Sequence, residues 1–130
     1  MTDANLFTRL DARMKSAGQK PAFLQPDGFV LRYDQLRSSV GRFANALAAL
    51  GVKPGDRVMV QAEKSLTAVC VYLAVLKIGA VYNPLNTAYT VAELDYFIGD
   101  AEPSVIIVSA ATKTALAALA AVISGLPHLV

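Results

Sequence analysis

The sequence is poor in the residues that bind metals, cross-link chains or carry charge. It holds one histidine, one cysteine and no tryptophan, and only 17% of its 130 residues are charged. A single cysteine excludes a disulfide within the chain, and we expect Cys70, which lies in an apolar stretch, to be a small packing residue in a reducing compartment. With His128 as the sole histidine, neither a metal site nor a Ser–His catalytic relay is expected.

Long apolar runs and clusters of basic residues are also missing. The longest uncharged apolar run extends from Leu66 to Leu76 and ends at Lys77, whereas a membrane-spanning helix needs about 20 predominantly apolar residues. The net charge is +2 and the basic residues are scattered, which predicts no nucleic-acid-binding surface. Asp3 and Asp11 lie in an amino-terminal stretch that is not typical of a signal peptide. We therefore expect a cytoplasmic protein without a membrane span.

Apolar residues, in contrast, are abundant and make up 55% of the chain. An average soluble domain has about 25% charged residues, so this chain has too few charges to cover its own surface. Because a membrane span is not expected, the composition favours a chain whose apolar faces are covered by further protein. The pattern also stops within an expected strand at residues 125–130. We expect a truncated chain that exposes an apolar face when isolated.

The order of the expected elements indicates an α/β fold. Helical spacing of apolar residues predicts helices over residues 5–17, 33–50, 65–78, 90–100 and 110–124, and short apolar runs predict strands over 57–61, 80–84, 104–108 and 125–130. A Pro-Asp-Gly turn at residues 26–28, between two short apolar runs, predicts a hairpin. Strands that are apolar on both faces and alternate with helices predict a mostly parallel sheet with helices on both faces.

Few residues carry a recognisable chemistry. The sequence contains neither a phosphate-binding loop of the G-x-x-x-x-G-K-[ST] type nor a G-x-G-x-x-G fingerprint. Thr90 and Glu93 have the spacing of a capping box at a helix start, so Glu93 is explained without an acid–base role. Glu63 and Lys64 are either a functional pair or two solvated loop charges. Taken alone, the residues predict a fold class and no activity.

Three segments resemble motifs of the adenylate-forming acyl-CoA synthetase superfamily. Residues 31–36 resemble its Leu-Thr-Tyr-x-Glu-Leu motif, residues 54–58 match its Gly-Asp-Arg-Val turn, and residues 76–86 resemble its Leu-Lys-x-Gly-Ala segment. Residues 63–65 and 84–103 are similar to bacterial malonyl-CoA synthetases in particular, with departures from the superfamily pattern at Arg32 and Asn83. The resemblance extends over the whole chain. It implies that residues 1–130 are a truncated amino-terminal portion of the large AMP-binding (adenylation) domain.

This resemblance implies a reaction in two steps. A carboxylate, either malonate or a close dicarboxylate, attacks the α-phosphate of ATP with Mg2+ to give an acyl-adenylate and pyrophosphate, and the CoA thiol then displaces AMP. The catalytic motifs of the superfamily match no residues of this chain, so the chain alone is expected to be inactive and to bind none of these cofactors. Its expected partners are the carboxylate substrate and the rest of the same polypeptide, comprising the remaining adenylation domain and a C-terminal domain.

One loop is a candidate site, and it follows the expected strand at residues 80–84. Ligands of parallel sheets bind beyond the carboxyl ends of the strands, and the resemblance implies that Asn86 and Thr87 border the CoA channel. The alternative is a strand-to-helix connector that Pro84 and Asn86 shape. For the chain as a whole, a self-sufficient binding or interaction module of the flavodoxin kind remains a second interpretation, because it shows the same alternation of elements.

Overall fold

The computed structural model describes residues 4–120 and 128–129. The elements are α1 (Leu6–Ala17), β1 (Pro21–Leu24), β2 (Val30–Arg32), α2 (Tyr33–Ala49), β3 (Arg57–Val60), α3 (Leu66–Lys77), β4 (Val81–Pro84), α4 (Val91–Ala101), β5 (Val105–Ile107), α5 (Ala110–Ala120) and β6 (His128–Leu129). Residues 121–127 of the region expected to form the last helix and strand lie outside the described part. None of the described helices is both long and apolar enough to span a membrane.

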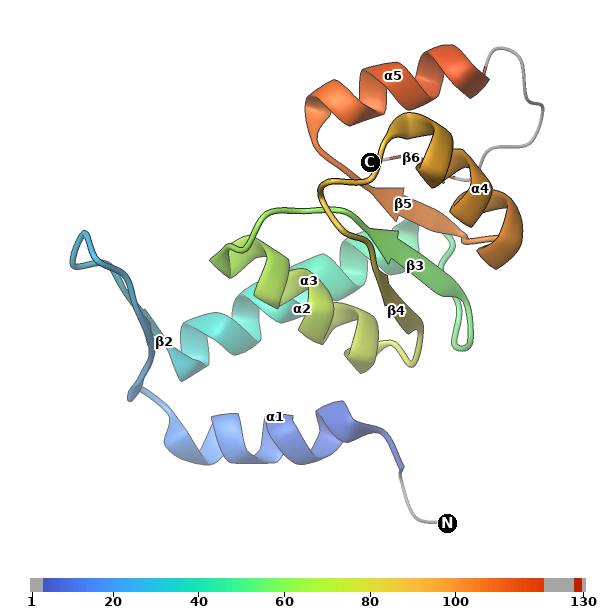
Figure 1. The fold of residues 1–130 in the computed structure, drawn as a ribbon. Coiled ribbons are helices and arrows are strands. Elements are labelled where there is room, and N and C mark those ends of the chain that lie inside the picture. The colour runs from blue at the N-terminus through green and yellow to red at the C-terminus, as the bar shows by residue number, and fades with distance from the viewer. Residues whose placement is uncertain (1–3, 121–127, 130) are drawn as a thin grey trace.

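Four parallel strands form the central sheet in the order β4–β3–β5–β6. Helices α2 and α3 cover one face of this sheet, and α4 and α5 lie on the other (Figure 1). The predicted parallel sheet with helices on both faces is therefore confirmed. The strand order places β3 between β4 and β5, so the chain leaves the carboxyl ends of β3 and β5 towards opposite edges of the sheet.

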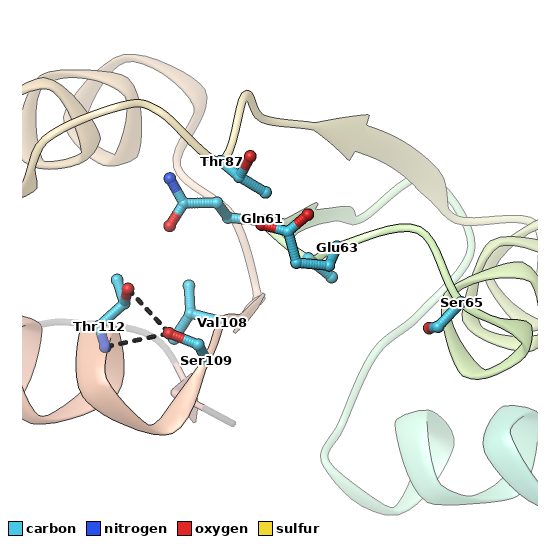
Figure 2. A pocket seen from close by; sticks show the side chains of 8 residues that line it. Gln61, Glu63, Ser65, Thr87, Val108, Ser109 and Thr112 are labelled. Carbon is cyan, nitrogen blue, oxygen red and sulfur yellow. Dashed lines mark hydrogen bonds between the residues drawn. The ribbon is translucent and has the colours of Figure 1, made fainter.

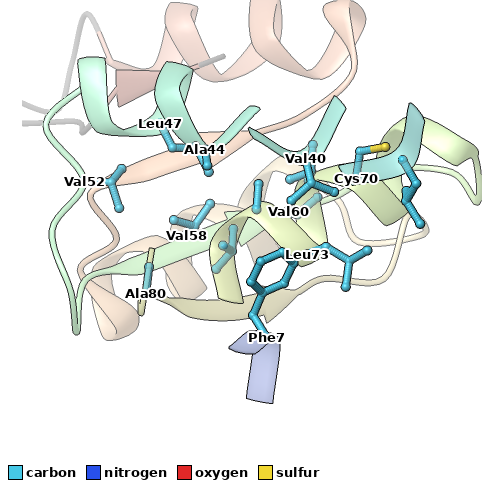
Figure 3. Packing of buried hydrophobic residues seen from close by; sticks show 14 of the residues in the cluster. Phe7, Val40, Ala44, Leu47, Val52, Val58, Val60, Cys70, Leu73 and Ala80 are labelled. Atoms are coloured by element: carbon cyan, nitrogen blue, oxygen red, sulfur yellow. The ribbon is translucent and has the colours of Figure 1, made fainter. Parts of the chain in front are cut away.

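The alternation of side chains along the strands creates a core on each face. Val58 and Val60 belong to the larger cluster beneath α2 and α3 (Figure 3), whereas Met59 between them contacts the cluster beneath α4 and α5. This follows from the two-residue period of a strand. The smaller cluster contains Leu94 from α4 and Leu116 from α5, each 1% exposed. Because both faces are covered, the ends of the strands remain as the accessible parts of the sheet.

Helix α1 and the hairpin β1–β2 lie outside these layers. Helix α1 packs against α2 and α3 and contributes Phe7 and Met14 to the larger core. Arg37 of α2 donates to the carboxylate of Asp11 of α1 with an Nε–Oδ1 distance of 2.7 Å, and this hydrogen bond lowers the pKa of Asp11. The strands of the hairpin pair antiparallel, as the sequence predicts, and Leu24 lies opposite Val30.

The predicted helix starts are confirmed at α3 and α4. The Ser65 hydroxyl accepts a hydrogen bond from the Ala68 amide at 3.0 Å, which caps α3. Thr90 and Glu93 form the capping box of α4, in which the Thr90 amide donates to Glu93 Oε2 at 2.8 Å. These caps fix where the connections from β3 and β4 end and the helices begin.

Candidate functional site

A pocket of about 370 Å³ lies at the carboxyl ends of β3, β4 and β5. Each strand is followed by a connection that supplies part of the lining (Figure 2), which consists of Gln61, Ala62, Glu63, Ser65, Thr87, Val108, Ser109 and Thr112. The connections after β3 and β5 run towards opposite edges of the sheet, so the pocket lies where the strand order reverses. Open parallel sheets bind ligands in this crevice.

Gln61 follows β3 directly and is buried, with 6% of its surface exposed. Its backbone amide extends the sheet by donating to the Ile107 carbonyl at 2.9 Å. Its side-chain Nε2 crosses to the connection after β4 and donates to the carbonyls of Asn86 at 2.8 Å and Tyr89 at 3.3 Å. Gln61 was not predicted as a site residue from the sequence. The available signal was a polar side chain that directly follows an apolar strand.

Asn86 and Thr87, the two residues implicated by sequence, have different positions. The Asn86 side chain is exposed and its Oδ1 accepts a hydrogen bond from the Ala88 amide at 2.9 Å, so it stabilises a tight turn. Thr87 is also exposed, but it lies on the wall of the pocket. The structure therefore places Thr87 at the pocket, whereas the Asn86 side chain shapes the connector.

Glu63 and Lys64 diverge from each other. Glu63 lines the pocket at the strand ends, and Lys64 lines a separate hollow of about 360 Å³ with Tyr72 and Tyr82. The two tyrosine rings of that hollow contact each other edge-to-face, with centroids 5.0 Å apart. Glu63 and Lys64 thus line two neighbouring hollows, which have Ser65 in common.

The pocket has hydroxyl groups but no basic side chain among its described lining residues. The hydroxyls of Ser65 and Ser109 accept hydrogen bonds from backbone amides at the starts of α3 and α5. Within residues 4–120 and 128–129, no group of three His, Cys, Asp or Glu side chains is placed to bind a metal ion. The polar side chains that line the pocket are thus the amide of Gln61, the carboxylate of Glu63 and the hydroxyls of Ser65, Thr87, Ser109 and Thr112.

Comparison with known proteins identifies the family. The profile described as "AMP-binding enzyme" matches residues 10–129, which is most of the chain. The chain belongs to the AMP-binding enzyme family. Among curated proteins it is 40% identical over 98 residues to tenellin synthetase of Beauveria bassiana, covering 75% of this chain and 2% of that protein. It is 29% identical over 118 residues to the long-chain-fatty-acid–CoA ligase FadD13 of Mycobacterium tuberculosis, covering 90% of this chain and 24% of that protein.

Solved structures of this family share the fold. Apo MatB from Rhodopseudomonas palustris superposes with a TM-score of 0.88 and 42% sequence identity, covering 98% of this chain and 25% of MatB. The ATP-bound form of MatB gives a TM-score of 0.80 with 41% identity. These similarities confirm the resemblance to acyl-CoA synthetases that the motifs indicate. The chain spans about a quarter of these structures and of FadD13.

Proposed function

We propose that these residues form the amino-terminal part of the adenylation domain of an acid–thiol ligase that makes malonyl-CoA. The observation that carries the proposal is the 42% identity to MatB, a malonyl-CoA synthetase, over 98% of this chain. The substrates are malonate or a close dicarboxylate, ATP and CoA, and the products are malonyl-CoA, AMP and pyrophosphate.

In this proposal the chain supplies scaffold and one wall of a binding site. Because the catalytic motifs of the superfamily match no residues of this chain, we assign the groups that bind ATP and Mg2+ to other parts of the whole enzyme. The remaining adenylation domain and a C-terminal domain would supply those groups.

Apart from Glu63, the polar side chains that line the pocket are uncharged, which suits the uncharged arm of CoA. That arm carries amide groups, which need neutral hydrogen-bonding partners and no counter-ion. Thr87 offers an exposed hydroxyl at the pocket wall, and Asn86 holds the turn that carries it. We place the border of the CoA channel at this connection, with Thr87 facing the arm and Asn86 supporting it.

A self-sufficient binding module is the second candidate. It is favoured by the strand order, because β3 lies between β4 and β5 as in doubly wound domains that bind a ligand at the switch point. The family match over residues 10–129 and the similarity to MatB favour the ligase.

The proposal is tested with the full-length polypeptide that contains these residues. We expect malonate-dependent exchange of pyrophosphate into ATP, followed by malonyl-CoA formation when CoA is added, with weaker activity on methylmalonate and acetate. Residues 1–130 alone are the matched control and are expected to show no exchange. Exchange with acetate but not malonate would overturn the substrate assignment, and the absence of exchange with every carboxylate would overturn the ligase.

A further inference from the structure

The side-chain amide of Gln61 is buried. A buried polar group destabilises the fold unless it is hydrogen-bonded. A glutamine amide has two N–H donors, and the Nε2 group of Gln61 contacts two acceptors, the Asn86 carbonyl at 2.8 Å and the Tyr89 carbonyl at 3.3 Å. No buried side-chain nitrogen or oxygen in the described residues lacks a partner. The burial of Gln61 is therefore compensated by bonds to one particular segment, the connection between β4 and α4.

Backbone and cap hydrogen bonds hold the two ends of that connection, and Tyr89 near its end packs against Phe97 with ring centroids 5.0 Å apart. At its start the Leu85 amide donates to the Val60 carbonyl at 2.9 Å, and at its end Thr90 caps α4. Between these points, the bonds within the connection join Tyr89 to Asn86 and Ala88 to Asn86. Among the described residues, the hydrogen bonds that reach the part between these ends from elsewhere in the fold come from Gln61.

Thr87 lies between the two carbonyls that Gln61 holds. Because the carbonyls of residues 86 and 89 both accept hydrogen bonds from Gln61 at the end of β3, these bonds restrain the backbone that carries Thr87. Figure 2 shows the Gln61 amide beside Thr87 at the edge of the pocket.

We propose that Gln61 is a positioning residue that holds residues 86–89 so that Thr87 faces the CoA arm. This inference rests on the proposed function, since CoA is the ligand that the connection would border. CoA enters the second half-reaction and not the first. Gln61 should therefore affect the use of CoA and leave the formation of the acyl-adenylate unchanged.

The test variant is Gln61→Met in the full-length polypeptide. Methionine has a similar length and shape but cannot donate to the two carbonyls. We expect the KM for CoA to rise about tenfold, equivalent to ~1.4 kcal/mol, while malonate-dependent ATP–pyrophosphate exchange is unchanged. Gln61→Glu should raise the KM for CoA further, because it places a carboxylate against two carbonyl oxygens.

A matched control separates positioning from a general loss of stability. Val40 is fully buried in the core between α2 and the sheet, away from the pocket. Val40→Ala should lower the thermal midpoint and leave the KM for CoA unchanged in the folded enzyme. Gln61→Asn, which keeps the amide at a shorter reach, serves as the test if Gln61→Met does not fold, and a smaller rise in the KM for CoA is expected.

The outcomes distinguish this inference from the proposed function. Loss of malonate-dependent exchange in the unmodified enzyme would contradict the proposed function itself. If exchange is present, an unchanged KM for CoA in a folded Gln61 variant overturns the positioning role. Equal losses of exchange and of CoA-dependent turnover would also overturn it, because they indicate a purely structural residue.

Discussion

The two ends of the parallel sheet both carry a hollow with polar groups in its lining, but these polar groups have different partners at the two ends. At the amino end a cleft of about 210 Å³ is lined by Gly55, Asp56, Arg57, Ala101, Glu102 and Ser104. At the carboxyl end the pocket of about 370 Å³ lies between the connections that follow β3, β4 and β5.

Polar groups at the amino end bind one another. The Asp56 carboxylate accepts a hydrogen bond from the Lys53 amide at 2.9 Å, and Arg57 Nη1 donates to the Ala101 carbonyl at the end of α4 at 2.7 Å. Backbone bonds then join the turns, such as that from the Gly55 amide to the Gly79 carbonyl at 2.9 Å. These contacts join successive connections and contribute to stability.

Polar groups at the carboxyl end form bonds that leave an open wall. Gln61 and Asn86 hold the connection in place, while Thr87 is exposed and lines the pocket. Parallel sheets in general bind ligands at this end. We therefore propose that the polar groups at the amino end contribute to stability and that those at the carboxyl end contribute to ligand binding.

The largest effect is expected from Gly79→Ala at the amino end. Gly79 has a φ of 74°, and an added Cβ would lie 3.5 Å from the Pro54 Cβ, an ordinary contact. The cost therefore comes from the left-handed backbone, at about 1–2 kcal/mol for a residue with a side chain, partly offset by the lower chain entropy of unfolded alanine. Calorimetry of the full-length enzyme should show a lower thermal midpoint. A rise in the KM for CoA with an unchanged thermal midpoint would contradict the assignment of the amino end to stability.

A smaller effect is expected from Thr87→Val at the carboxyl end, and it should change the KM for CoA and not the thermal midpoint. Valine keeps the shape of threonine and removes the hydroxyl, which is exposed in the free chain. We expect an unchanged thermal midpoint. The KM for CoA should rise by the factor that corresponds to the loss of one neutral hydrogen bond, about 0.5–1.5 kcal/mol of binding free energy. Thr67→Val, at an exposed position of α3 outside the pocket lining, is the matched control. An equal KM for CoA in the two variants would show that the Thr87 hydroxyl does not contribute to CoA binding.

The smallest effect concerns the pH dependence of stability through Asp56. The hydrogen bond from the Lys53 amide lowers the pKa of Asp56 in the folded chain. A carboxyl whose pKa is lower in the folded than in the unfolded state stabilises the fold above the unfolded pKa of about 3.9, and this contribution is lost as the pH falls through the folded pKa. Asp56→Asn should therefore flatten the acid side of a plot of thermal midpoint against pH. An identical acid slope in both proteins would exclude Asp56 from that role.

Local sequence signals predicted most of the fold. The Ser65 and Thr90 caps, the hairpin and the alternation of helices and buried strands are each determined by residues close together in the chain. The order of the strands was not predictable in this way, because it depends on which edge of β3 each crossover reaches. Periodicity specifies that a strand is buried on both faces and does not specify its neighbour.

The candidate site was predictable in part. A loop after a parallel strand is a general ligand-binding position, which brought attention to Asn86 and Thr87. The contribution of Gln61 depends on a contact with Asn86, 25 residues away in the sequence, and no local pattern encodes such a distance. Whether Glu63 and Lys64 act together was also open, and the structure directs these neighbouring side chains to different hollows.

The most direct test of the account is malonate-dependent ATP–pyrophosphate exchange by the full-length polypeptide, measured together with the KM for CoA in the unmodified enzyme and in Gln61→Met. The account predicts exchange with malonate in both proteins and a raised KM for CoA in the variant alone. The absence of exchange with malonate would contradict the account. A loss of exchange in Gln61→Met that equals its loss of CoA-dependent turnover would also contradict it.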